Sequence, residues 1–267
     1  QKAAAKMARL FQANYIRTYV LKGVVVSEWY PNPAHRTSVD LDCYLTNDFN
    51  SLSSSSVQGE DRDAWSLGND LIVSKGFEVN QDFYKNSSFG LSGVLVENHQ
   101  YLTPFRGNER LKKLESFFQS QFKNLRVQDV QADSRIGDTY MYRPPVMVTA
   151  LFLIEHAYSH FLHEGLTWRM VLDWVMFRKK HEKEIVWNDV EAYIDEFGFR
   201  KFFDVFNAIG METFNDNEND NGSPDGSKSQ ENHNQNHQEF ANLRMIMVND
   251  IWAPLDVHET VRGIKGK

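Results

Sequence analysis

The spacing of hydrophobic and polar positions changes part-way along the chain. In residues 1–105, short apolar runs rich in β-branched side chains alternate with helical patterns, as in proteins that combine a sheet with helices. From residue 109 onward, apolar side chains recur mainly at the spacing of helices. The pattern therefore predicts an α+β fold, with a mixed sheet and helices in residues 1–105 and a helical domain in residues 106–267.

The predicted sheet region begins with a helix and then alternates between strands and helices. In order, the pattern predicts a helix over residues 3–15, a strand over 17–23, a helix over 24–30, a strand after residue 35 and a helix over 64–76. Gly76 is expected to close the last of these helices. Two further strands are predicted over residues 77–85 and 91–102, with residues 86–90 as the hairpin turn between them.

The second part is expected to be helical up to a polar segment. Helices are predicted over residues 108–122, 146–165 and 167–184, with one or two more in 187–214. Residues 215–238 are rich in Asn and nearly free of apolar side chains. They bury too little surface to offset their ordering entropy, so a flexible loop is predicted there. A last helix is expected over residues 239–252.

Composition and charge narrow the classes of function. Hydrophobic residues make up 41% of the 267 residues, enough for a sizeable core. No apolar run approaches the roughly 20 residues of a membrane-spanning helix. The formal net charge is −7 and no basic stripe is evident, which argues against a nucleic-acid partner. Cys43 is the single cysteine, and a free thiol without a secretory signal suggests the cytoplasm.

The stretch HRTSVDLDCYL, residues 35–45, carries two carboxylates inside an apolar run. Because side chains alternate faces along a strand, Asp40 and Asp42 are expected on one face and Cys43 on the other, which faces the core. Two like charges this close repel each other, so their presence indicates a compensating cation. Carboxylates two positions apart can share one Mg²⁺ or Mn²⁺ ion, or bridge two. We therefore predict a divalent metal site at Asp40 and Asp42.

Phosphate contacts are expected next to this strand. Gly23 ends the strand predicted over 17–23, where a glycine turn offers backbone N–H groups and the start of the following helix favours anions. Lys22, Arg36 and Ser38 lie close by in the sequence and carry side chains that donate hydrogen bonds to phosphate oxygens. These four residues form the predicted phosphate-binding group.

The helix predicted before residue 167 carries a second set of metal-ligating residue types. His156 and His160 share one helical face, with His163 and Glu164 one turn further along, and two such histidines can bind Zn²⁺. The HExxH order, with a general base between the two ligands, is absent. A zinc hydrolase built on these residues and a set of hydrogen-bonded structural histidines are both open interpretations.

Arg169 and Asp173 occupy one face of the next predicted helix. At a spacing of four residues, they are placed to form an ordinary ion pair within the helix. Alternatively, Arg169 faces a cleft between the two predicted parts of the chain and contacts a ligand phosphate or a second substrate, the acceptor. The sequence leaves both interpretations open.

Two segments of the chain resemble a known enzyme family. LKGVVVSEWYPNPAHRTSVDLDCYL, residues 21–45, resembles the active-site region of the polymerase-β-like nucleotidyltransferase superfamily, with a glycine turn, a helix and a strand carrying Asp-x-Asp. Within that superfamily it is similar to a bacterial branch of uncharacterised nucleotidyltransferases, which has an Arg shortly before Asp-x-Asp. HFLHEGLTWRMVLDW, residues 160–174, resembles the helical motif of the same branch. The two segments occur in the expected order.

The resemblance implies a reaction and roles for particular residues. It implies transfer of a nucleoside monophosphate from an NTP, with ATP as the expected donor, to a hydroxyl acceptor that the sequence does not identify. Asp40 and Asp42 would bind Mg²⁺ or Mn²⁺, and a third carboxylate on a neighbouring strand would help to activate the acceptor hydroxyl. Glu97 is the candidate for this third carboxylate, with Glu78 and Asp82 as rivals.

Catalysis and nucleotide binding are therefore assigned to a small set of residues. The expected catalytic residues are Asp40, Asp42 and Glu97, and the expected nucleotide contacts are Lys22, Gly23, Arg36, Ser38 and Arg169. The superfamily's usual Gly-Ser turn is Lys-Gly here, and Val39 stands before the first aspartate where a Ser or Gly is usual. A catalytically inactive relative that binds a nucleotide or a protein partner is the alternative function.

Overall fold

The structure, a computed structural model, describes residues 2–38, 40–47, 63–125, 135–136 and 138–214. Its strands are β1 (Ile16–Val20), β2 (Asp40–Asn47), β3 (Asn80–Phe83), β4 (Asn86–Leu91), β5 (Val94–His99) and β6 (Met141–Tyr142). Its α-helices are α1 (Lys2–Gln12), α2 (Val24–Ser27), α3 (Ala64–Ser74), α4 (Glu109–Asn124), α5 (Val146–His163), α6 (Trp168–His181), α7 (Trp187–Glu196) and α8 (Arg200–Phe214). A 3-10 helix, Pro33–His35, precedes β2. The predicted α+β class is confirmed.

The described strands form a mixed sheet in the order β3-β4-β5-β2-β1-β6. Strands β3, β4 and β5 form an antiparallel meander, and β5 pairs in parallel with β2. Strand β2 pairs antiparallel with β1, which pairs in parallel with β6. Strand β2 is therefore hydrogen-bonded on both sides, which fixes the direction of both of its faces.

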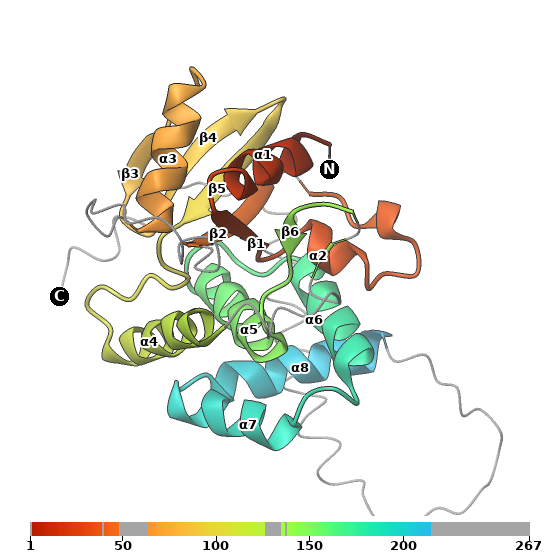
Figure 1. The fold of residues 1–267 in the computed structure, drawn as a ribbon. Helices are drawn as coiled ribbons and strands as arrows, with labels where there is room; N and C mark the ends of the chain where they lie inside the picture. The colour runs from red at the N-terminus through yellow and green to blue at the C-terminus, as the bar shows by residue number, and fades with distance from the viewer. Residues whose placement is uncertain (1, 39, 48–62, 126–134, 137, 215–267) are drawn as a thin grey trace, which may run out of the picture.

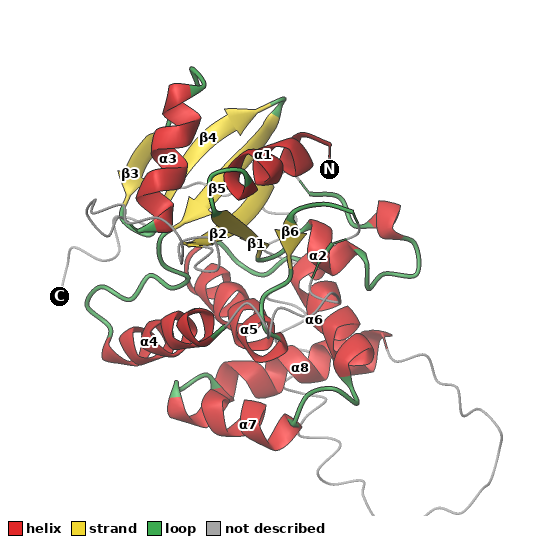
Figure 2. Cartoon of the chain, viewed as in Figure 1, coloured by secondary structure: helices red, strands yellow, loops and turns green. Residues whose placement is uncertain are grey.

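Helices cover both faces of the sheet (Figures 1 and 2). Helices α1 and α3 pack against β1 and β2, and with one face of the sheet they enclose a core that includes Phe11 and Cys43. Helices α4 to α8 gather on the other side, and their core reaches the sheet at Tyr19 and Tyr44. The two faces of β2 thus look into two different cores, as the alternation of its side chains predicts.

Local signals in the sequence explain where several helices begin and end. The side chains of Asp63 and Asn108 accept hydrogen bonds from backbone N–H groups in the first turns of α3 and α4. Gly76, with a φ of 83°, lies just after α3 as predicted. Helix α5 begins directly after Pro145.

The region between α3 and α4 differs from the prediction. Residues 86–90, predicted as a hairpin turn, belong to strand β4, so this region holds three strands and not two. Ser87 and Phe89 are buried between more exposed neighbours, which is the alternation of a strand. The turn falls instead at Ser92 and Gly93, with φ of 52° and 80°. Consecutive positive φ angles are typical of tight hairpins, so the Ser-Gly pair was the stronger turn signal.

A short strand from the second half of the chain joins the sheet. Met141 and Tyr142 of β6 pair in parallel with Thr18 and Tyr19 of β1. The sequence did not predict this strand, because two residues are too few to produce a periodic pattern. The division into two domains near residue 105 stays a prediction, and β6 forms a backbone link between the two proposed parts.

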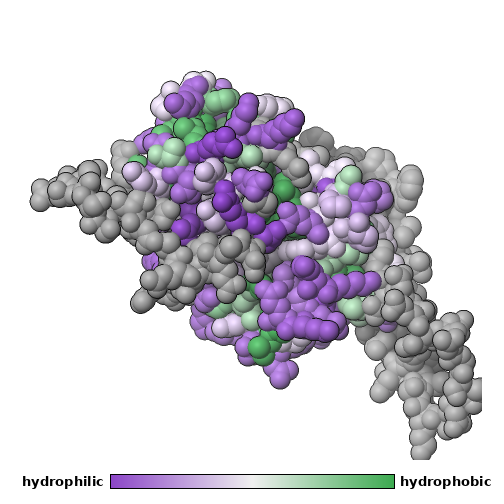
Figure 3. All heavy atoms as spheres, turned by 45° about the vertical axis from the view of Figure 1, so that its right-hand side comes forward, coloured by the Kyte–Doolittle hydropathy of each residue, from purple (hydrophilic) through white to green (hydrophobic). Residues whose placement is uncertain are grey.

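One face of the described chain can be compared by hydropathy. The face drawn in Figure 3 is mostly hydrophilic where residues are described, with small separate hydrophobic areas. None of the described helices combines the length and the apolar character needed to cross a membrane. The predicted flexible loop at 215–238 and the predicted helix at 239–252 lie outside the described residues.

Candidate active site

Strand β2 directs Asp40 and Asp42 toward one cation. The Lys22 ammonium lies 3.3 Å from Asp40 Oδ2 and 3.2 Å from Asp42 Oδ2. Asp42 is buried and Asp40 is partly exposed, with 2% and 27% of their side chains accessible. Lys22 follows β1, whose end is held against β2 by a hydrogen bond of 3.0 Å from Leu21 N–H to Asp42 O. The two carboxylates therefore converge on a single positive charge, as expected of their spacing on a strand.

The charges of this group stabilise one another. Burial opposes ionisation of Asp42, but the hydrogen bond with His99 and the charge of Lys22 outweigh it and hold the pKa of Asp42 well below its usual range. Burial alone would lower the pKa of Lys22, yet Asp42 and Asp40 raise it above its ordinary value. Asp42 Oδ2 has no hydrogen-bond partner of good geometry among the described residues, so the ammonium acts as its counter-charge.

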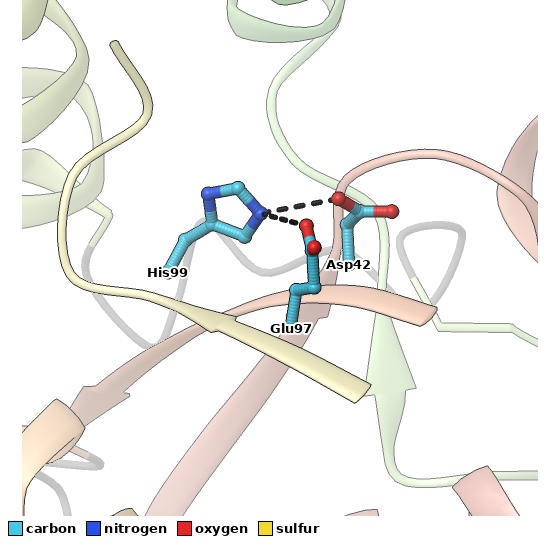
Figure 4. A group of neighbouring side chains, drawn as sticks. All are labelled: Asp42, Glu97 and His99. Carbon is cyan, nitrogen blue, oxygen red and sulfur yellow. Dashed lines mark hydrogen bonds and ion pairs between the residues drawn. The ribbon is translucent and has the colours of Figure 1, made fainter. Parts of the chain in front are cut away.

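Strand β5 places Glu97 and His99 beside Asp42 (Figure 4). The parallel register sets Glu97 opposite Asp42 and His99 opposite Tyr44. His99 Nε2 lies 3.1 Å from Asp42 Oδ1 and 3.7 Å from Glu97 Oε2, and its Nδ1 lies 3.3 Å from Tyr101 O. Burial would lower the pKa of His99, but the two carboxylates outweigh this effect and raise it. Both nitrogens of the imidazole therefore have an oxygen partner, which fixes the orientation of the ring beside the two carboxylates.

These residues fit a divalent metal ion. One ligand atom each from Asp42, Glu97 and His99 lie within 4.8 Å of one another, close enough to share an ion. The Lys22 ammonium contacts the other oxygen of Asp42, Oδ2, together with Asp40 Oδ2. Its charge marks a second position at which the two aspartates can hold a cation. Carboxylates are the ligands that Mg²⁺ and Mn²⁺ prefer, whereas an imidazole also suits softer metals. Asp42 belongs to both groups and is the centre of the candidate site.

Of the two rivals for the third carboxylate, the structure describes the side chain of Glu78. Glu78 is exposed and precedes β3, which is the edge strand of the sheet. The side chain of Asp82 lies outside the described part of the structure. Glu97 lies in register with Asp42 on the neighbouring strand. Glu97 therefore remains the candidate for this role.

Gly23 and Ser38 meet beside Asp40 at the turn between β1 and α2. Gly23 has a φ of 72°, and a Cβ at this position would lie 2.7 Å from Ser38 Oγ and 3.8 Å from Asp40 O. Both the positive φ and the close approach favour glycine. Three of the predicted phosphate contacts, Lys22, Gly23 and Ser38, are therefore brought together at one end of β2.

Arg36 is buried against helix α6. Its Nε and Nη2 donate to Asp173 Oδ1 and Oδ2 at 3.0 and 2.7 Å. Its Nη1 donates to Thr37 O at 2.8 Å and to Ser38 Oγ at 2.9 Å. The Tyr30 hydroxyl donates to the same Asp173 Oδ1 at 2.7 Å. Arg36 thus joins the segment before β2 to a helix of the second half of the chain.

Arg169 lies one turn before Asp173 on α6 and is exposed. The ion pair within the helix that the spacing permitted is not formed in the described structure, because Asp173 bonds to Arg36 and Tyr30 instead. The other interpretation of Arg169, a contact with phosphate or acceptor, stays a prediction.

The histidines of α5 approach the candidate site from the helical side. His156 Nε2 lies 3.5 Å from Lys22 Nζ, and the His156 and His160 ring centroids are 4.5 Å apart. His160 Nδ1 pairs with Glu164 Oε2 at 3.0 Å. Burial and the charge of Lys22 lower the pKa of His156 well below its ordinary value. Within the described ranges these residues are not part of a three-ligand metal group, so the zinc hydrolase hypothesis has no structural support.

The sequence-based prediction omitted His99, His156 and Asp173 from the site. A signal for His99 was present, because it follows Glu97 by two residues on the same face of a predicted strand. His156 and Asp173 contact Lys22 and Arg36 across 134 and 137 positions of the chain. A single sequence carries no periodic signal for contacts of that kind.

Comparison with known families assigns the chain to one of them. Residues 1–209 match the profile of a family described as "Uncharacterised nucleotidyltransferase". The chain belongs to this nucleotidyltransferase family. The matched region of the nucleotidyltransferase contains all of the predicted site residues, from Lys22 to Arg169. The resemblance found in the sequence is thereby confirmed at the level of the family.

Other comparisons add little to this assignment. No curated protein matches the chain. A solved structure of the antibiotic-resistance factor ANT(2'')-Ia is similar with a TM-score of 0.42 and 7% identity, over 80% of this chain and 99% of that one. The family match is therefore the basis for describing the chain as a nucleotidyltransferase.

Proposed function

We propose that this nucleotidyltransferase moves a nucleoside monophosphate from an NTP, with ATP as the expected donor, to a hydroxyl group of an acceptor. The main support is the convergence of Asp40 and Asp42 on Lys22, with Glu97 in register on the neighbouring strand, in a chain that belongs to this family. The net charge of −7 favours a small molecule or a protein as the acceptor over a nucleic acid.

A divalent cation, Mg²⁺ or Mn²⁺, would be held by Asp40 and Asp42, with Glu97 as third carboxylate. When bound, such a cation lowers the pKa of an acceptor hydroxyl and neutralises charge on the phosphates. The ammonium of Lys22 occupies the space between the two aspartates. Lys22 would therefore move from the aspartates to the phosphates when the cation and the NTP bind.

The remaining residues would bind and orient the reactants. The acceptor oxygen forms a bond to the α-phosphorus, the bond from that phosphorus to the β-phosphate oxygen breaks, and pyrophosphate leaves. Glu97 would accept the proton of the acceptor hydroxyl. The Gly23 turn and Ser38 would donate hydrogen bonds to the triphosphate, and Arg169 would contact the triphosphate or the acceptor from α6.

Label transfer from α-labelled NTPs tests the proposal. Wild-type protein, Asp42→Asn and Asp189→Asn would each be incubated with the four NTPs, Mg²⁺ or Mn²⁺, and a fractionated cell extract. Asp189 is an exposed aspartate in the first turn of α7 and serves as the matched control. We expect label to enter an acceptor with wild-type protein and Asp189→Asn, and not with Asp42→Asn.

The same experiment distinguishes the alternative of an inactive binding module. If wild-type protein binds an NTP in calorimetry but transfers no label under any of these conditions, the chain is a nucleotide-binding relative without transferase activity. Equal transfer by wild type and Asp42→Asn would show that the reaction does not use this carboxylate.

A further inference from the structure

Arg36 has little capacity left for a ligand. A guanidinium carries five N–H donors, and the Arg36 group makes two bonds to Asp173 and one each to Thr37 O and Ser38 Oγ. Only 5% of the Arg36 side chain is exposed. An arginine that contacts a triphosphate directly needs free donors facing the solvent, and Arg36 instead directs its donors into the protein.

Asp173 is fully engaged on its side of the same group. Both of its oxygens accept from Arg36, Oδ1 also accepts from the Tyr30 hydroxyl, and 6% of its side chain is exposed. Trp29, next to Tyr30, packs on the rings of Phe177 and His181 of α6, with centroid distances of 5.6 and 5.1 Å. The segment between β1 and β2 is therefore attached to α6 at two neighbouring points.

Ser38 is the point at which this attachment reaches the phosphate-binding turn. Arg36 Nη1 donates to Ser38 Oγ, and this hydroxyl lies against the Cα of Gly23. A serine hydroxyl has one donor and two acceptor positions. Because Arg36 uses an acceptor position, the hydroxyl hydrogen of Ser38 stays available to donate, and Ser38 is exposed. The bond from Arg36 thus fixes the oxygen and leaves its hydrogen for an anionic ligand.

We propose that Arg36, Asp173 and Tyr30 form a clamp, anchored on α6, that positions Ser38 and the Gly23 turn to bind the triphosphate of an NTP. Arg36 acts through Ser38 and does not touch phosphate. Asp173 and Tyr30 are positioning residues. Asp173 lies on α6, and Tyr30 lies in the segment between β1 and β2. The inference rests on the proposed function for the identity of the ligand, but the clamp itself is defined by contacts within the chain.

Substitution of Asp173 separates the two possible roles of Arg36, because they predict opposite results. In Asp173→Asn, Arg36 keeps its charge but loses the carboxylate with which it forms an ion pair. If Arg36 contacted phosphate directly, this variant would bind NTP equally well or more tightly. A clamp predicts weaker binding, by about tenfold, because a bond between charged groups is lost and Ser38 is no longer held. Calorimetry with ATP and Mg²⁺ measures the dissociation constants.

The ion pair between Asp195 and Arg200 provides a matched control. Asp195 accepts two hydrogen bonds from Arg200, at 2.7 and 2.9 Å, but this pair is exposed and connects the end of α7 to α8. Asp195→Asn therefore removes the same type of bidentate pair away from the turn. We expect its ATP affinity and its melting temperature to stay close to those of the wild type.

Hydrogen exchange tests the clamp without any nucleotide. In Asp173→Asn, backbone amides in residues 22–38 should exchange about tenfold faster, given the loss of one charge-assisted pair, while the amides of β5 keep their protection. Asp195→Asn should leave both regions unchanged. Because this readout needs no ligand, it remains informative if wild-type protein fails to bind ATP and the proposed function is wrong.

The clamp is overturned if Asp173→Asn exchanges like wild type in residues 22–38, or if it binds ATP as tightly as wild-type protein does. Should Asp173→Asn fail to fold, Tyr30→Phe removes one hydrogen bond from the same carboxylate and serves in both measurements. In steady-state kinetics, Tyr30→Phe should raise the KM for ATP more than it lowers kcat. Arg36→Lys keeps the charge but loses the planar fork of donors, and it should have the same effect.

Discussion

At Leu41, Asp42 and Cys43, both faces of strand β2 are buried, but they serve different purposes. On one face, Leu41 and Cys43 are covered by α1 and α3 in an apolar core. On the other face, Asp42 is 2% exposed and lies among Lys22, Glu97 and His99. Neighbouring positions therefore have the same exposure, and only the partners of each side chain differ. Burial of a charged side chain with charged partners, and not exposure, distinguishes the candidate active face from the core face.

The difference between the faces follows from the energetics of burial. An apolar side chain is stabilised by removal from water, whereas a buried carboxylate needs a counter-charge and hydrogen bonds. Asp42 has both, through Lys22 and His99. The active face therefore combines groups whose charges depend on one another, so substitutions there should change chemistry, whereas substitutions on the core face should change stability.

The largest effect is expected for Asp42→Asn. The amide keeps the shape of the side chain but removes the charge on which the cation depends, so nucleotidyl transfer should fall about 100- to 1000-fold. Circular dichroism should show a folded variant, and Asp189→Asn is the activity control. A loss of less than about threefold, within the scatter expected of such changes, would show that this face is not the active one.

A large effect on stability is expected on the helix that covers the active face. Glu155 of α5 is 1% exposed, neither of its oxygens has a hydrogen-bond partner among the described residues, and burial raises its pKa to about 7. In the unfolded chain this carboxyl ionises near its ordinary pKa of 4.5. The folded state therefore keeps the proton to higher pH, and the stability that this provides is present below pH 4.5 and lost as the pH rises to about 7.

The test compares urea unfolding of wild type and Glu155→Gln across this pH range. Relative to the variant, the wild type should lose on the order of 3 kcal/mol of unfolding free energy between pH 4.5 and pH 7. Above pH 7 the difference should be constant. Glu196→Gln, an exposed glutamate of α7, should keep the pH dependence of the wild type. Identical pH profiles for wild type and Glu155→Gln would contradict the assigned environment.

Lys22→Met should change two affinities in opposite directions. The variant removes the ammonium that lies between Asp40 and Asp42, so Mn²⁺ should bind more tightly in the absence of nucleotide. ATP should bind about tenfold more weakly, because the loss of a charge-assisted contact to phosphate costs roughly that much. Electron paramagnetic resonance of Mn²⁺ and calorimetry with ATP measure the two effects. Lys113→Met, at an exposed position of α4, is the control. Parallel changes in both affinities would exclude the proposed movement of Lys22.

The smallest effect is expected on the core face. Cys43→Ala should lower the unfolding free energy by about 1 kcal/mol through lost packing, with no change in transferase activity. Burial also raises the pKa of the Cys43 thiol, so thiol reagents should label it only on unfolding. Labelling rates in urea provide the measurement. A clear loss of activity in Cys43→Ala would mean that the two faces are not separable in the way described here.

Much of the arrangement followed from local patterns in the sequence. Alternation along residues 40–45 predicts which face of β2 carries the carboxylates, and the same rule places Glu97 and His99 together on β5. The prediction of a turn over residues 86–90 is wrong, because the polar residues 86–88 resemble a turn in composition while they alternate like a strand. For such short elements, pairing with neighbouring strands outweighs local propensity.

By itself, the amino-acid sequence determined the class of the fold, the family and the carboxylates that lie on one strand face, because periodicity and short motifs are local properties of the chain. Only the tertiary structure decided that Arg36 bonds to Asp173, that Lys22 lies between two aspartates and near His156, and that β6 completes the sheet. The contacts of Arg36 with Asp173 and of Lys22 with His156 depend on the packing of the helical half against the sheet, and the place of Lys22 between the aspartates depends on the pairing of β1 with β2. A charged side chain takes whichever partner the packing brings within reach, and spacing along the chain does not encode that choice.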